Sequence, residues 1–314
     1  EVATDNSLIQ SDYKFHLWNS LLLTKGLFFY MNTRDFIVLL LVSMLWGGSF
    51  FFIRLLVLDG LEPLQIVSIR MQLAALFILP FFLNKLKKYS FYDHGFSFVL
   101  IGILNTALPF TLFSFASLKL GAGSLSILQA TVPILTALLL FSLYRNELSI
   151  PKIGGVLLGF AGLFVLVGPT GSLDTFSGIL CIIASISYAV SGIYLSKTSN
   201  KISNSFVGMG AILVGAIIML PFVFIYLPML EKISYSSWLY LLTLGIVNTA
   251  AAFVIFIGLI KRIGPINASY VTYFVPLSSI SLGIIFLDEV ITTTLVIGAL
   301  MILSGVFLSN KQQK

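Results

Sequence analysis

The chain has 314 residues, of which 58% are hydrophobic and only 10% are charged, and its formal net charge is +6 at pH 7. Soluble domains carry about 25% charged residues, because their surface must interact with water. These proportions exclude an ordinary soluble enzyme, a nucleic-acid-binding protein and a disordered chain, and they indicate a membrane protein with several spans. The single cysteine, Cys181, excludes a disulfide framework and a metal site built from cysteines.

The first thirty residues fit this pattern poorly. Residues 15–30 are apolar but are interrupted by His16, Asn19 and Lys25, and no small-residue cleavage site marks a signal peptide. From Met31 the sequence reads like a natural start, with a short polar lead before a long apolar stretch. We therefore expect residues 1–30 to be an N-terminal extension that is either interfacial or not part of the native protein.

Ten apolar stretches follow, each long enough to cross about 30 Å of hydrocarbon as a helix. They cover residues 36–58, 64–83, 96–117, 122–143, 152–168, 178–195, 205–227, 238–258, 266–286 and 292–309. The alternation typical of barrel strands is absent, and a helix satisfies its own backbone hydrogen bonds in lipid. The sequence therefore predicts an all-α integral membrane protein with ten transmembrane helices.

The positions of the basic residues predict the orientation. With a cytoplasmic N-terminus, fourteen of the 18 lysines and arginines fall on the inner side, Lys119 and Lys232 fall on the outer side, and Arg54 and Arg70 lie within helices. Such an excess is typical of cytoplasmic loops. We expect a multi-pass protein of a bacterial inner membrane with both termini in the cytoplasm.

The second half of the chain repeats the first. Five matched pairs carry this observation: Gly102 with Gly245, Asn105 with Asn248, Thr106 with Thr249, Phe110 with Phe253, and Pro133 with Pro276. We expect one five-helix repeat in residues 31–171 and another in residues 172–314. Because five is odd, the second repeat must be inverted in the membrane, as in many secondary transporters.

Several short motifs are similar to a known family. They are Trp46-Gly47-Gly48-Ser49-Phe50 with Arg54, Glu62-Pro63 with Arg70, Pro133 with Glu147, Pro276 with Asp288-Glu289, and Gly298 through Gly305. Over residues 36–308 the chain resembles EamA-type members of the drug/metabolite transporter superfamily. The resemblance implies a ten-helix carrier that moves amino acids or other small metabolites, often outward. The sixth helix departs from the pattern, with Tyr188 where the first helix has Trp46.

Two prolines mark candidate helix breaks. Pro133 and Pro276 lie near the middle of the fourth and ninth helices, and each frees the carbonyl four residues earlier, at Gln129 and Thr272. Interrupted helices in matching positions of two repeats indicate a substrate site. The alternative is a kink that only shapes the packing.

Asn105 and Asn248 form the second candidate pair, near the middle of their helices. A buried amide offers two donors and an acceptor, which suits an amino acid or another zwitterion. The alternative is a hydrogen bond between helices, worth about 0.6 kcal/mol on average.

Arg70 is the most informative single charge. It lies about 9 Å inside the second helix from its outer end, and an arginine at that depth usually faces a cavity or a partner. Its guanidinium can bind a carboxylate through two hydrogen bonds. The second repeat has Ala211 at the matching position. The alternative is an arginine that extends towards the interface and pairs with Asp59 or Glu62.

Aromatic residues complete the candidate site. Trp46, Tyr188, Tyr270 and Tyr273 can line a cavity between the repeats, although plain packing is the alternative for each. No Asp or Glu lies deep in any predicted span, and both histidines fall outside them. Proton-driven carriers usually need such a group, so we expect a facilitator or exchanger without cofactor or metal. The alternative is coupling through a group that the sequence does not identify.

These observations predict a secondary transporter, an exporter or exchanger of amino acids or related small metabolites that works by alternating access. One alternative is a multidrug carrier that expels amphipathic compounds, and another is a membrane scaffold or receptor that transports nothing. The expected partners are a small-molecule substrate and the lipid bilayer, with no nucleic acid. The fifth and tenth helices lack polar groups and can form a scaffold or the surface of a homodimer.

Overall fold

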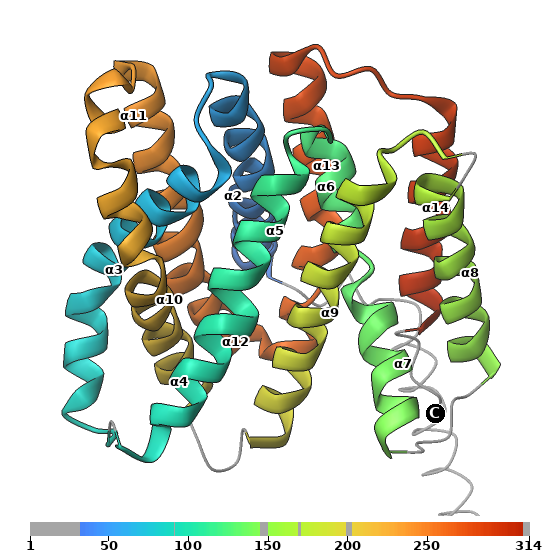
Figure 1. The fold of residues 1–314 in the computed structure, drawn as a ribbon. Coiled ribbons are helices and arrows are strands. Elements are labelled where there is room, and N and C mark those ends of the chain that lie inside the picture. The colour runs from blue at the N-terminus through green and yellow to red at the C-terminus, as the bar shows by residue number, and fades with distance from the viewer. Residues whose placement is uncertain (1–31, 91, 145–149, 169–170, 199–202, 310–314) are drawn as a thin grey trace, which may run out of the picture.

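The computed structural model describes residues 32–90, 92–144, 150–168, 171–198 and 203–309, and these residues form a bundle of helices without a strand (Figure 1). The predicted all-α class is therefore confirmed for the described residues. The extension expected at residues 1–30 lies outside them, as does Glu147.

The helices of the two halves follow one another in a similar order. The first half contains α2 (Thr33–Leu58), α3 (Pro63–Leu86), η1 (Tyr92–His94), α4 (Gly95–Gly102), η2 (Ile103–Ala107), α5 (Leu108–Ala116), α6 (Ala122–Gln129), α7 (Val132–Tyr144) and α8 (Ile150–Val167). The second half contains α9 (Thr175–Thr198), α10 (Asn204–Tyr226), η3 (Leu227–Lys232), α11 (Tyr235–Leu242), η4 (Thr243–Ala251), α12 (Ala252–Ala268), α13 (Val271–Leu287) and α14 (Thr293–Ser309).

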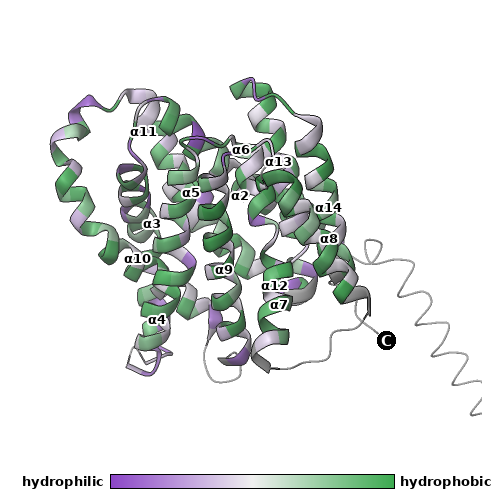
Figure 2. Ribbon diagram, turned by 45° about the vertical axis from the view of Figure 1, so that its right-hand side comes forward, coloured by the Kyte–Doolittle hydropathy of each residue, from purple (hydrophilic) through white to green (hydrophobic). Residues whose placement is uncertain are grey.

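Seven helical segments are long and apolar enough to cross a membrane. They are Thr33–Leu58, Pro63–Leu86, Tyr92–Ala116, Ala122–Ser142, Thr175–Lys197, Asn204–Lys232 and Tyr235–Gly264. Three shorter apolar helices accompany them, at Ile153–Val167, Val271–Leu287 and Thr293–Leu308. Hydrophobic residues dominate the helices, and hydrophilic ones gather mainly near the helix ends and in the connections (Figure 2). Many large hydrophobic side chains, such as Leu76, Phe164 and Ile217, are exposed on the outside of the bundle. This distribution is that of a protein surrounded by lipid.

Both halves contain a π-helical turn at matching positions. In the first half it is η2, which carries Asn105, and in the second it is η4, which carries Asn248. The wider turn adds a residue to the helix and changes the direction of the side chains that follow it. Such turns are frequent at functional sites, and here they rotate both asparagines within their helices.

The proline-containing helices are interrupted in two different ways. Between α6 and α7 the helix breaks at residues 130–131, and Pro133 is the second residue of α7, where its missing N–H costs little. In the second half the chain bends at Gly264, whose φ of 79° favours glycine, and turns again at residues 269–270. Pro276 lies inside α13, beyond this break. The two interruptions therefore match less closely than the spacing of the prolines suggests.

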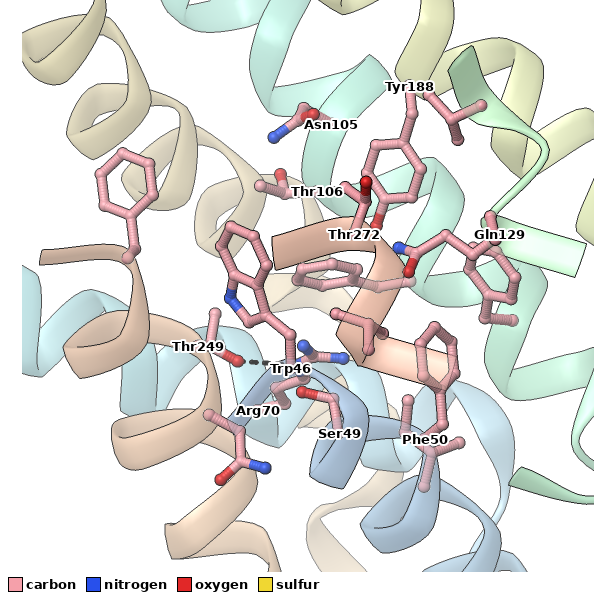
Figure 3. Close-up of a pocket in the computed structure, with 18 of the residues that line it drawn as sticks. Trp46, Ser49, Phe50, Arg70, Asn105, Thr106, Gln129, Tyr188, Thr249 and Thr272 are labelled. Atoms are coloured by element: carbon pink, nitrogen blue, oxygen red, sulfur yellow. Dashed lines mark hydrogen bonds between the residues drawn. The ribbon is translucent and has the colours of Figure 1, made fainter. Parts of the chain in front are cut away.

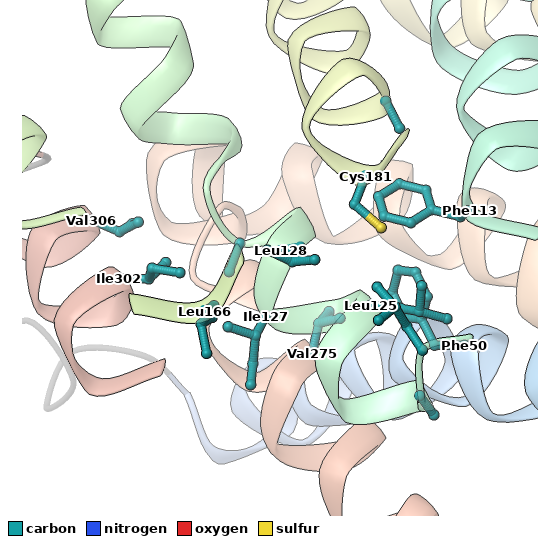
Figure 4. Packing of buried hydrophobic residues seen from close by; sticks show 14 of the residues in the cluster. Phe50, Phe113, Leu125, Ile127, Leu128, Leu166, Cys181, Val275, Ile302 and Val306 are labelled. Carbon is teal, nitrogen blue, oxygen red and sulfur yellow. The ribbon is translucent and has the colours of Figure 1, made fainter. Parts of the chain in front are cut away.

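The packing between α8 and α14 depends on small residues. A side chain added at Gly305 would meet the carbonyl oxygen of Gly155 at 2.6 Å, and one added at Gly162 would meet that of Gly298 at 2.9 Å. Glycine is needed here because the two backbones approach closely. Leu166 of α8 and Ile302 and Val306 of α14 belong to the adjoining hydrophobic core (Figure 4).

Glu289 connects the second half to the first at one end of the bundle. It lies in the turn between α13 and α14, and its carboxylate accepts hydrogen bonds from the backbone N–H groups of Ala122, at 2.7 Å, and Gly123, at 3.3 Å. These are two of the unpaired donors in the first turn of α6. A negative charge at this position also interacts favourably with the helix dipole.

We expect Glu289→Ala to lower the free energy of unfolding by about 1–2 kcal/mol, the usual effect of removing a helix cap. Glu289→Gln should retain part of the stability, because its amide oxygen still accepts a hydrogen bond. Thermal unfolding of the purified protein in lipid nanodiscs measures the difference. Glu231→Ala makes the same chemical change on the exposed η3 segment, and equal stability of the two alanine variants would contradict the assigned contact.

Candidate substrate-binding site

A cavity of about 290 Å³ lies inside the bundle, between helices from both halves. Eight of the eleven residues expected at the site line it: Trp46, Arg70, Asn105, Gln129, Pro133, Tyr188, Asn248 and Thr272. They come from seven different helical regions, which are far apart in the sequence. The cavity therefore exists only where the two halves meet.

Arg70 projects into this cavity from α3 with only 4% of its surface exposed (Figure 3). Its Nε donates a hydrogen bond of 2.9 Å to the hydroxyl of Thr249 on η4. The guanidinium carbon lies 3.7 Å from the centre of the Phe110 ring, a cation–π contact. These two contacts hold the side chain in one orientation, and among the described residues no hydrogen bond uses its terminal nitrogens.

The alternative of an ion pair with Asp59 or Glu62 does not occur in the structure. Asp59 accepts a hydrogen bond from the hydroxyl of Ser237, at 2.9 Å, and Glu62 accepts one from that of Tyr226, at 3.3 Å. Within the described part of the chain the recorded ion pair joins Arg262 to Asp35, at 2.6 Å, away from the cavity. Arg70 is therefore a buried cation without an acidic partner there.

Both asparagines contact a neighbouring helix as well as the cavity. The side-chain oxygen of Asn105 accepts a hydrogen bond of 3.0 Å from Ser191 on α9. The amide nitrogen of Asn248 donates one of 2.7 Å to the carbonyl oxygen of Leu45 on α2. Each amide thus joins two helices with one of its polar atoms, and both residues also line the cavity.

Aromatic rings form much of the remaining wall. The rings of Phe50 and Phe113 are 5.3 Å apart, and Phe113 stacks on Tyr188 at 6.3 Å. Trp46 packs on the ring of Phe256, 4.7 Å away. Gln129, next to the break between α6 and α7, lies beside the hydroxyl of Tyr188 (Figure 3). The wall therefore combines flat apolar surfaces with a few hydrogen-bonding groups, as small-molecule sites commonly do.

Tyr270, Tyr273 and Pro276 do not line this cavity. The two tyrosine rings lie 6.2 Å apart and pack against the hydrophobic core around α2 and α13. Pro276 is buried within α13. The break in the ninth helical region precedes Val271, so Tyr270 lies at the turn and Tyr273 lies in the first turn of α13. Thr272 is the residue nearest to the break that lines the cavity.

The structure also identifies a residue that the sequence reasoning did not select. Ser49 lines the cavity with 6% of its surface exposed, and its hydroxyl has no hydrogen-bond partner among the described residues. The repeat contains a signal for it, because Ser49 matches Ser191 when Trp46 is aligned with Tyr188. Ser191 is bonded to Asn105, whereas the hydroxyl of Ser49 makes no hydrogen bond within the described residues.

We expect Ser49→Ala to weaken substrate binding about three- to tenfold, the effect of one lost hydrogen bond. Its thermal stability should stay the same or rise, because the buried hydroxyl makes no bond to the protein that would be lost. Ser114→Ala is a matched control, since this hydroxyl is also buried and unpaired in the described structure but lies outside the cavity. A parallel fall in binding by both variants would contradict a role specific to Ser49.

A helical membrane bundle with a cavity where two halves meet, and with interrupted helices beside that cavity, has the architecture of a membrane transporter. The model of the EamA-like transporter family matches the chain twice, over residues 34–168 and 175–311. The chain therefore belongs to the EamA-like transporter family, within the drug/metabolite transporter superfamily. It is a multi-pass membrane protein.

Relatives with similar sequences agree with this assignment. YoaV of Bacillus subtilis, an uncharacterized transporter, is 23% identical over 86% of this chain and 94% of its own length. An uncharacterized transporter of Archaeoglobus fulgidus is 26% identical over 90% and 99%. YedA of Escherichia coli K12, an uncharacterized inner membrane transporter, is 25% identical over 76% and 78%. A protein crystal structure with 15% identity has the same fold, with a TM-score of 0.57 over 88% of this chain and 96% of that one.

Proposed function

We propose that this transporter carries small metabolites with a carboxylate, amino acids among them, out of the cell by alternating access. The observation that carries this proposal is the position of Arg70. Its Nε and one face of its guanidinium are held by Thr249 and Phe110, while its terminal nitrogens make no bond within the described protein. A carboxylate can accept two hydrogen bonds from such a group.

The proposal includes ten membrane-spanning helices. The three shorter apolar helices, at Ile153–Val167, Val271–Leu287 and Thr293–Leu308, add to the seven longer segments. A helix of 17 residues is about 25 Å long, and spans of about this length occur in membranes. The close contact between α8 and α14 lets two of these short helices cross side by side.

Matched contacts support an inverted relation between the two halves. A side chain added at Gly102 would meet the carbonyl oxygen of Ala211 at 3.2 Å, and one added at Gly245 would meet that of Arg70 at 2.9 Å. Gly102 matches Gly245 in the repeat, and Arg70 matches Ala211. Each third helical region therefore packs on the second region of the other half in the same way. Two such halves can exchange their packing, which gives inward-open and outward-open states.

The inner side of the membrane is assigned to the end of the bundle that carries the basic residues. Arg262 pairs with Asp35 near the start of α2. Lys85, near the end of α3, donates a hydrogen bond of 2.7 Å to Ser205 at the start of α10. In Figure 1, α2 runs upward and α14 runs downward, so the start of α2 and the end of α14 lie on the same side of the bundle. We assign that side to the cytoplasm of a bacterium, following the distribution of positive charge.

Counterflow into proteoliposomes that contain the purified protein tests the function. Vesicles loaded with an unlabelled amino acid or carboxylate should accumulate the same labelled compound, and protein-free vesicles should not.

The aromatic wall favours a second candidate function, the export of amphipathic drugs that need no ionic partner in the cavity. Exchange of amphipathic cations and of no carboxylate would support that function instead, and no exchange of any compound would support a scaffold.

A further inference from the structure

We propose that the substrate carries a net charge of −1, so that the loaded cavity is neutral and the protein works as an exchanger of monoanions. This inference rests on the proposed function and narrows it. Carboxylic acids without an ammonium group fit the site, whereas zwitterionic amino acids leave one positive charge in it.

The wall of the cavity carries a single positive charge among its described residues. Among the described residues that line the cavity, Arg70 is the charged side chain. The other polar groups are neutral: the hydroxyls and amides of Ser, Thr, Tyr, Asn and Gln, and the indole N–H of Trp46. One carboxylate cancels the charge of Arg70. The ammonium group of an amino acid would find no acidic partner on this wall, and it would enter a cavity that is already cationic.

The two halves differ at the position of this charge: the first half has Arg70, and the second has Ala211. Thr249 and Thr106 are matching residues: the first bonds to Arg70, and the second lies against the backbone of Ala211. Ala211 stands at the position that matches Arg70 in the repeat. An arginine there would have made the cavity suitable for a dianion, but the side chain of Ala211 is a methyl group. Gly208, Ile212 and Phe253 line the cavity on this side. The site therefore has one ionic end and one apolar end.

The cavity also has hydrogen-bond donors close to the charge of Arg70. The terminal nitrogens of Arg70 are unused, and the hydroxyl of Ser49 is buried without a partner in the described structure. Figure 3 shows Ser49 beside Arg70 at the cavity wall. A carboxylate has two acceptor oxygens, and these donors can satisfy both of them.

The consequence for transport follows from the cost of a buried charge. Closing the cavity around an unpaired guanidinium is unfavourable, because a low-dielectric surrounding penalises a charge without a partner. Binding of a monoanion removes this penalty. The loaded protein should therefore change between its two states faster than the empty one, and exchange should be faster than net flux.

The binding test uses three probes with the same phenyl body: 3-phenylpropanoate, phenylalanine and 2-phenylethylamine. The protein is placed in lipid nanodiscs at pH 7, and binding is followed by tryptophan fluorescence, to which Trp46 at the cavity wall contributes, and by thermal unfolding. We expect the acid to bind at least tenfold more tightly than the amino acid, with no binding of the amine. Arg70→Gln should abolish this preference, and the matched control Arg54→Gln, outside the cavity, should keep it.

The transport test compares exchange with net efflux of labelled 3-phenylpropanoate from proteoliposomes. Unlabelled acid outside should accelerate the release of label at least tenfold. Equal binding of phenylalanine, equal rates of net efflux and exchange, or no binding of any probe would overturn the inference. The proposed function survives the first two outcomes as long as Arg70→Gln weakens transport of the carboxylate, and it fails if that variant transports normally.

Discussion

Replacement of Arg70 by alanine is expected to reduce transport of a carboxylate substrate about a hundredfold, the effect of losing two charge-assisted hydrogen bonds. The protein should still fold. Arg70 makes one hydrogen bond, to Thr249, and its removal relieves the membrane interior of a charge that costs about 2.5–3.5 kcal/mol on insertion scales. Counterflow rates and thermal unfolding, measured on the same preparation, separate the two effects.

Two further variants make this result specific. Arg70→Lys keeps the charge but loses the planar two-point geometry, so it should recover only part of the transport. Arg54→Ala removes the other arginine within a helix, which donates to the backbone oxygen of Ser117 and does not line the cavity. Full transport by Arg70→Ala would support the drug-export alternative and would remove the basis for a carboxylate substrate.

The second large effect is expected from Gly47→Val. In α2 this glycine lies against α13, and a side chain here would meet the hydroxyl oxygen of Ser278 and, at 2.7 Å, the carbonyl oxygen of Val275. The helices would have to separate, because backbone atoms block the new side chain. Overpacking of this kind usually costs about 1–3 kcal/mol, and the loss should appear in thermal unfolding and in the amount of folded protein.

Gly192→Val is the matched control for this change. Gly192 lies in α9, and a side chain added there has no heavy atom within 4 Å. The same substitution should therefore leave stability almost unchanged, or raise it by a few tenths of a kcal/mol, because valine has a somewhat higher helix propensity than glycine. Similar unfolding of Gly47→Val and Gly192→Val would show that α2 and α13 are not closely packed.

Much of the candidate site was predictable, because it repeats. Asn105 and Asn248 match, both line the cavity, and Pro133 lies beside a helix break. The positions of Tyr270 and Tyr273 were harder to predict. The bend at Gly264 and the turn after Ala268 rotate this segment, so the rings pack against the hydrophobic core. Successive residues of a helix point about 100° apart, and one extra turn residue is enough to move a side chain from a cavity to a packed face.

The amino-acid sequence alone determined the membrane class, the ten apolar segments and the duplication. These features depend on local hydrophobicity and on residue order, since lipid selects segments by their length and composition. Only the tertiary structure decided which side chains meet. Arg70 lies against Thr249 and Phe110, Ser49 is left unpaired, and the acidic residues near α3 bond elsewhere. The physical reason is that the rotation of each helix depends on close packing with helices distant in the sequence, and neither hydropathy nor spacing contains that information.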